Sequence, residues 1–173
     1  EVDVLKGPAA VLYGNSPPGG IYNLTSRRAD DVFGGELGVR LGSDDFKQVQ
    51  GTVTGPLGES LSARATLLYR DRGSQTDHVT GERTFFAPTF TWDIAEDTSF
   101  TGLAYYQKDA NTGDTNGYLP AHGTLLGNPN GQIPRGRNLG EPDYNRYDRT
   151  QTAIGWDFRH AFSDTVSFQQ NAK

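Results

Sequence analysis

Residues 1–28 read EVDVLKGPAAVLYGNSPPGGIYNLTSRR, and this stretch decides how the rest of the chain is interpreted. Apolar residues at 2–5 and at 21–24 predict two short buried strands of a small sheet. Between them, Pro8 is suited to the first position of a helical turn, where a missing N–H is tolerated. Glycines, whose backbone adopts angles that other residues avoid, stand at Gly7, Gly14, Gly19 and Gly20. The stretch therefore predicts two strands joined by a tightly turned segment.

After Arg28 the apolar residues recur at every second position, which predicts half-buried β-strands. Seven runs follow this pattern, and their apolar positions fall within residues 37–41, 49–53, 61–69, 86–94, 100–106, 152–158 and 166–168. Pro88 lies in the middle of the fourth run and has no N–H to donate. We therefore expect a bulge or a locally unpaired stretch in that strand.

The connections between these runs alternate in length from the second one onwards. They comprise residues 43–45, 55–60, 73–81, 95–97, 110–148 and 163–164. Short turns on one side and long loops on the other are typical of transmembrane β-barrels. A soluble β-sandwich or barrel also has evenly spaced short strands, and periodicity alone does not separate an apolar interior from an apolar exterior. The nearly forty residues of 110–148 favour the membrane barrel, because such long loops are uncommon in compact domains.

The composition restricts the classes of function. The net charge of −5 argues against nucleic-acid binding, which favours a basic surface. The 173 residues contain no Cys, so neither a disulfide framework nor a thiolate metal site is expected. No apolar run approaches the roughly 20 residues of a membrane-spanning helix. Barrel strands need only about 9–11 residues of alternating pattern, so a membrane protein stays possible.

Residues 4–23, VLKGPAAVLYGNSPPGGIYN, resemble the signature at the end of the plug domain of TonB-dependent outer-membrane receptors. The motif positions that match are Gly7, Pro8, Tyr13, Gly14, Gly19 and Gly20. The resemblance implies an all-β fold in which residues 1–30 form the C-terminal part of the plug domain. Residues 31–173 are then the N-terminal strands of an antiparallel transmembrane β-barrel, about seven of the twenty-two that the family has. Because no signal peptide precedes them, we expect an internal segment of a longer protein.

The same resemblance implies a ferric-siderophore receptor in the bacterial outer membrane. TonB, together with ExbB and ExbD, would supply energy through a region upstream of residue 1, and lipid and lipopolysaccharide would surround the barrel. No cofactor or protein-bound metal is expected, because the transported siderophore itself fills the coordination sphere of the iron. Lys6 stands where the family often has arginine against barrel carboxylates, so a plug–barrel contact is expected there. A solvated lysine is the alternative.

Residues 115–124, TNGYLPAHGT, resemble the third extracellular loop of ferrichrome receptors, which implies a siderophore of the hydroxamate class. In those receptors, aromatic residues before the Leu-Pro pair contact the ligand, and Tyr118 occupies that position here. His122 and Tyr144 are weaker candidates in the same connection. Aromatic rings with a polar tip suit a compact complex that has an apolar rim and carbonyl oxygens. The alternative for Tyr118 is a loop tyrosine that packs only on its neighbours.

Other functions find less support in the sequence. The glycine-rich residues 16–20 are not followed by the Lys-Ser or Lys-Thr of a phosphate-binding loop. His78, His122 and His160 are far apart, and no hydrolase motif is present, so an enzyme is not expected. Uptake of cobalamin or a glycan is the alternative within transport. A signal-transducing siderophore receptor would carry a further N-terminal domain, and a passive porin would lack the plug signature.

Overall fold

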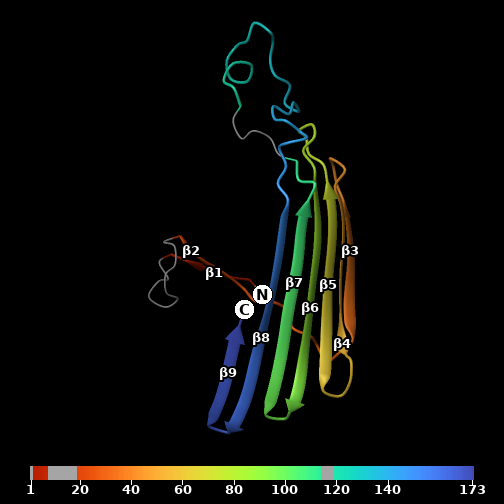
Figure 1. Cartoon of the computed structure of the whole chain (residues 1–173), viewed down its shortest axis with the longest axis vertical. Helices are drawn as coiled ribbons and strands as arrows, with labels where there is room; N and C mark the ends of the chain where they lie inside the picture. The colour runs from red at the N-terminus through yellow and green to blue at the C-terminus, as the bar shows by residue number, and fades with distance from the viewer. Residues whose placement is uncertain (1, 8–18, 114–118) are drawn as a thin grey trace.

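The computed structural model describes residues 2–7, 19–113 and 119–173. All regular elements in these residues are β-strands, arranged in a two-stranded sheet and a seven-stranded sheet (Figure 1). The all-β class and the antiparallel strands predicted from the sequence are therefore confirmed. In this described part of the chain, no helix has the length and hydropathy to cross a membrane, an observation that concerns helices alone.

The small sheet consists of β1 (Val2–Lys6) and β2 (Gly20–Leu24), paired antiparallel from Val2↔Leu24 to Lys6↔Gly20. Gly20 has a φ of 119°, and a Cβ there would overlap the carbonyl of Leu5, so the position requires glycine. The strands were correctly predicted, but their burial was not. Tyr22 is 77% exposed, because a two-stranded sheet has no second layer to cover its side chains.

The large sheet is an antiparallel meander in which each strand pairs with the next along the chain. Its strands are β3 (Gly34–Leu41), β4 (Lys47–Pro56), β5 (Leu61–Arg72), β6 (Gly81–Ala95), β7 (Thr98–Ala110), β8 (Arg149–Ser163) and β9 (Val166–Ala172). Each of the seven alternating runs has become one strand, because period-two alternation survives only in an extended backbone.

The two faces of the large sheet differ in chemistry. Register partners share a face, so one level across the apolar face carries Leu37, Gly51, Leu67, Phe86 and Tyr106. The adjacent level of the opposite, polar face carries Glu36, Thr52, Thr66 and Ala87. Among the described residues no hydrophobic side chain is fully buried. A soluble sandwich would pack its apolar face inside, so the exposed apolar face supports the membrane barrel.

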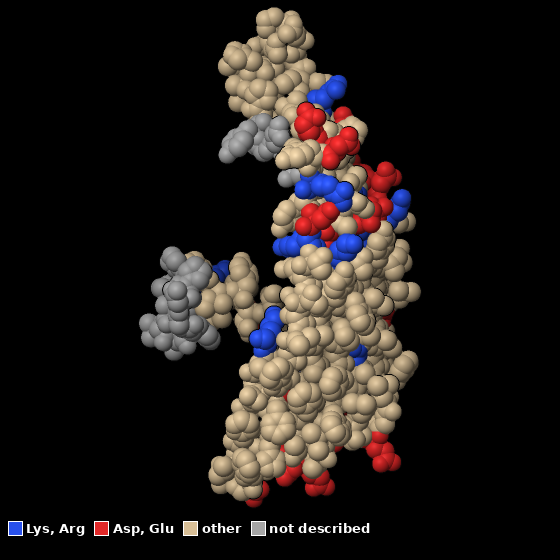
Figure 2. Space-filling model, in the orientation of Figure 1, with Lys and Arg blue, Asp and Glu red and all other residues tan. Residues whose placement is uncertain are grey.

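On the face of the molecule that Figure 2 shows, charged side chains are concentrated at the two ends of the strands. Figure 2 shows basic and acidic residues gathered near the upper ends, acidic residues at the lower turns, and a largely uncharged band between them. An apolar band bounded by polar ends is expected of strands that cross a hydrocarbon layer. The distribution therefore agrees with the alternation of the two faces.

Pro88 interrupts one ladder without shifting it. The β6–β7 pairing stops after Phe86↔Tyr106 and resumes at Thr89↔Leu103 in the same register. The register shift in this pair of strands lies elsewhere, between Asp93 and Ala95. Proline lacks the N–H that a central strand donates, so the break appears where the sequence predicted an unpaired stretch.

The connections sort onto two ends of the sheet. Residues 119–148 of the connection between β7 and β8 extend beyond the upper ends of the strands in Figure 1, beside the connection 73–80. These two connections are joined, because Asp77 N–H donates to the carbonyl of Gly136 (2.7 Å) and Asn138 Nδ2 donates to the carbonyl of Asp77 (2.9 Å). At its base, Tyr147 N–H donates to the carbonyl of Thr112 (2.9 Å). The long connection is thus held by its neighbour and by its own ends.

Candidate functional site on the polar face

The chain between β2 and β3 runs against the polar face and is attached to it at several points. Asp30 N–H donates to Thr54 Oγ1 on β4 (2.9 Å), and Ser62 Oγ on β5 donates to Asp31 Oδ1 (2.5 Å). Arg64 on β5 donates through Nε to the carbonyl of Arg28 (2.6 Å) and also forms an ion pair with Asp30. Backbone and side-chain bonds together therefore fix residues 28–31 on β4 and β5.

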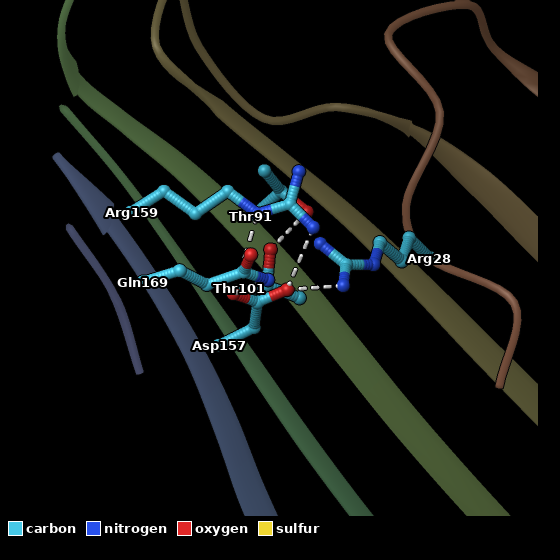
Figure 3. A network of polar contacts seen from close by, with 6 residues as sticks. All are labelled: Arg28, Thr91, Thr101, Asp157, Arg159 and Gln169. Carbon is cyan, nitrogen blue, oxygen red and sulfur yellow. Dashed lines mark hydrogen bonds and ion pairs between the residues drawn. The ribbon is translucent and has the colours of Figure 1, made fainter. Parts of the chain in front are cut away.

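A second attachment joins the same segment to β8, also on the polar face. Asp157 on β8 has a side chain only 2% exposed, and Arg28 donates to its Oδ2 (Figure 3). Arg159 Nη2 donates to the same oxygen (3.1 Å), and Gln169 Nε2 from β9 donates to Oδ1 (3.3 Å). We call Arg28, Asp157, Arg159 and Gln169 the Asp157 network. Two guanidinium groups and an amide thus compensate one buried carboxylate, as a buried charge requires.

The sequence pattern did not reveal the Asp157 network. The alternation around Trp156 and Phe158 assigns Asp157 to the polar face, which was the available signal. Its partner Arg28 lies 129 residues away in the chain, and no periodicity connects positions so distant. Only the strand register, which places β8 opposite the chain segment before β3, brings the two together.

A cleft lies between residues 24–27 and the middle of the polar face. Leu24, Ser26 and Arg27 line one side of the cleft, and Phe85 with Tyr105 lines the other. The rings of Phe85 and Tyr105 stack with centroids 6.2 Å apart. The cavity volume of about 530 Å³ lies within the range of small-molecule sites.

The predicted ligand residues lie in the segment 111–148, and the structure describes two of them, His122 and Tyr144. Tyr118 falls outside the described residues. The His122 ring nitrogen Nδ1 lies 3.2 Å from the carbonyl of Gly127, and Tyr144 is 85% exposed. No hydrogen bond or ring contact links His122 with Tyr144. Both side chains are exposed to solvent, and their role in ligand binding stays a prediction.

The predicted plug residues are only partly described. Lys6 ends β1 opposite Gly20, and no ion pair of Lys6 occurs among the described residues. Gly7 and Gly20 have positive φ angles of 89° and 119°. Pro8, Tyr13 and Gly14 lie outside the described residues. In the described ranges, no cluster of three His, Asp or Glu residues could hold a metal ion.

Comparison with known proteins finds receptors that resemble this chain. The chain is 35% identical over 175 residues to the ferrioxamine B receptor of Salmonella typhimurium, covering 100% of this chain and 25% of the relative. It is 34% identical over 176 residues to the ferrichrome outer membrane transporter/phage receptor of Escherichia coli, covering 100% of this chain and 23% of the relative. The whole chain is thus similar to a part of each of these two receptors. No family model matches the chain.

Solved structures agree on the fold. The siderophore receptor PiuA from Acinetobacter baumannii superposes with a TM-score of 0.77 at 22% identity, over 98% of this chain and 25% of the solved one. The ferripyoverdine receptor of Pseudomonas aeruginosa gives a TM-score of 0.72 at 25% identity, over 93% of this chain and 21% of the solved one. The chain thus spans about a quarter of the length of the relatives it matches. These relatives are named as receptors and a transporter rather than as enzymes.

Proposed function

We propose that this chain forms part of the wall of an outer-membrane receptor for the TonB-dependent uptake of ferric siderophores of the hydroxamate class. The observation that carries the proposal is the match along the whole chain to a ferrioxamine B receptor and a ferrichrome transporter. The exposed apolar face is consistent with contact to lipid and lipopolysaccharide. TonB, with ExbB and ExbD, would supply the energy through the plug.

We further propose that residues 1–30 belong to the plug and residues 31–173 to the barrel. The separation of β1 and β2 from the seven-stranded sheet supports this division. The attachment of residues 28–31 to β4 and β5 lies at the proposed boundary. Lys6 would then contact barrel carboxylates beyond this chain, as the family resemblance implies.

Iron uptake tests the proposed function directly. Iron-starved cells with and without the complete gene are given radioactive iron in a panel of siderophores, and each strain is repeated without TonB. Loss of uptake confined to ferrichrome-like and other hydroxamate complexes, and dependent on TonB, is the expected result. Loss of a different complex would keep the transporter and discard the hydroxamate class. If no iron complex were affected, the siderophore assignment would fail, and cobalamin or glycan uptake would be measured next.

Removal of the candidate aromatic rings should weaken binding. We expect Tyr118→Ala and Tyr144→Ala each to reduce the affinity for a hydroxamate complex about fivefold, since a ring contact contributes about 1 kcal/mol. Equilibrium binding to outer-membrane vesicles measures the change. Asn130→Ala is the matched control, because Asn130 is exposed in the same connection and has no aromatic ring. Equal affinities for the control and both tyrosine variants would remove these residues from the site.

A further inference from the structure

Arginines are concentrated at the upper end of the polar face. Arg40, Gln48, Arg70, Arg83, Asp109 and Arg149 are successive register partners across β3 to β8, so their side chains share one level of one face. Arg72 lies two residues beyond Arg70 on the same face. Arg70, Arg72, Arg83 and Arg149 line one pocket of about 200 Å³ and are called the arginine cluster.

One carboxylate serves most of the ion pairs in this cluster. Arg83 Nε lies 2.5 Å from Asp109 Oδ1, and Arg149 Nη2 lies 3.4 Å from Asp109 Oδ2. Gln107 Nε2 also donates to Asp109 Oδ2 (2.9 Å). Glu82, the other acid that lines the pocket, accepts from Asn111 Nδ2 (2.8 Å). Both oxygens of Asp109 and the Oε1 of Glu82 are thus already engaged by neighbouring side chains.

Arg70 and Arg72 are left without a carboxylate partner among the described residues. The Nε of Arg70 is buried and has no hydrogen-bond acceptor in this part of the structure. Arg70 also stands directly opposite Arg83 in the β5–β6 register. Like charges placed opposite each other destabilise a sheet, and a buried donor without an acceptor carries a desolvation penalty. An external anion beside Arg70 and Arg83 would reduce the repulsion between the two guanidinium groups.

The geometry of the pocket favours an oxygen anion. Guanidinium groups present a planar fork that matches carboxylate and phosphate oxygens. Thr112 and Tyr147, near the two ends of the long connection, line the same pocket. Its volume accommodates one anionic group but not a whole metal chelate. The bulk of a bound complex must therefore lie outside the pocket, towards the cleft or the long connection.

We propose that the arginine cluster binds a free carboxylate of the ferric complex, so that the receptor prefers anionic over cationic complexes with the same chelating core. This inference rests on the proposed function and narrows its substrate class. The phosphates of lipopolysaccharide are the rival anion. In a barrel they lie outside, against the apolar face, whereas the arginine cluster lies on the polar face.

The test uses one chelating core with three charges. A linear ferric trihydroxamate is prepared with its terminal amine free, acetylated or succinylated, which gives a cationic, a neutral and an anionic complex. Affinities for the complete receptor in outer-membrane vesicles are measured by equilibrium binding of radioactive iron. We expect the succinylated complex to bind about tenfold more tightly than the complex with the free amine, as two unit steps of charge near partly exposed arginines would give. The acetylated complex should lie between them.

Substitutions assign the preference to the cluster. Arg70→Gln and Arg72→Gln should reduce the affinity mainly for the succinylated complex and bring the three affinities together. Arg135→Gln is the matched control, because it removes the same charge from an exposed position in the long connection, outside the pocket. We expect the control to keep the order of affinities.

Four results would overturn the inference. Equal affinities of the wild-type receptor for the succinylated and acetylated complexes would show that no carboxylate site exists. An equal loss for all three complexes in Arg70→Gln would give the cluster a structural role only. Loss of bound lipopolysaccharide in that variant, with the order of affinities retained, would assign the cluster to lipid phosphates. If none of the three complexes bound, the proposed function itself would fail, and this inference with it.

Discussion

Replacing Asp157 by alanine should destabilise the receptor by about 3 kcal/mol and loosen the chain segment before β3, which keeps its attachments to β4 and β5. The side chain of Asp157 is almost fully buried, and its removal leaves Arg28 and Arg159 without their shared acceptor. Breaking a buried ion pair from one side costs about 3–5 kcal/mol. The lower end is expected here, because Arg28 and Arg159 are partly exposed and water can solvate them.

Urea unfolding of the complete receptor measures the loss of stability, and limited proteolysis within residues 25–33 reports the loosening of the segment. Asp157→Asn should have an intermediate effect, since it keeps the shape and one acceptor oxygen but loses the charge. Asp93→Ala is the control, because Asp93 is an exposed aspartate on β6 that has no side-chain bond among the described residues. If Asp157→Ala and Asp93→Ala were equally stable and equally resistant, the network would not anchor the segment.

Adjacent leucines on β5 provide the second test with a large effect. Leu67 belongs to the apolar face and is 55% exposed, whereas Leu68 belongs to the level of the polar face that contains Gln50 and Phe85. Leu67→Arg should cost about 2–4 kcal/mol, because it places a guanidinium in the middle of a lipid-facing strand. Leu68→Arg, with the same change one residue along the chain, should cost far less on the polar face.

The two variants are compared by their yield of folded receptor in the outer membrane, followed by heat-dependent gel mobility. If the apolar face instead faced water, Leu67→Arg would cost little, because the guanidinium would stay solvated. Similar yields for both variants would contradict the assignment of faces. Because both variants replace a leucine of β5 by arginine, the comparison keeps the strand, the residue type and the introduced charge the same.

The elements of the large sheet could be predicted from the sequence because each alternating run carries its own evidence. Phe86, Phe90 and Trp92 show the face of β6 without any knowledge of β5 or β7, and Pro88 marks its own break in the ladder. The expected burial of β1 and β2 was wrong. Val2 and Tyr22 form an apolar pattern, but a pattern does not say whether a second layer is present to cover it.

The functional groups on the polar face could not be predicted in this way, because they depend on register. Arg70 and Arg83 face each other only because β5 and β6 pair with one offset, and a shift by one residue would turn one of them to the apolar face. Arg28 and Asp157 meet through a sheet that spans most of the chain. Tyr118, His122 and Tyr144 were proposed from a loop resemblance and stay predictions.

The two groups of charges on the polar face differ in their contact with water, and ionic strength should therefore act on them differently. Exposed charges are screened over about 8 Å at physiological salt, whereas buried pairs are screened much less. The arginines of both groups are partly open to solvent, but the carboxylate that Arg28 and Arg159 share, Asp157, is enclosed. Salt should consequently weaken the attraction of an anion to the arginine cluster. It should leave the segment before β3 attached to the polar face through the Asp157 network. The receptor would then bind an anionic ligand differently in seawater and in fresh water, but the attachment of this segment to the sheet would be the same in both.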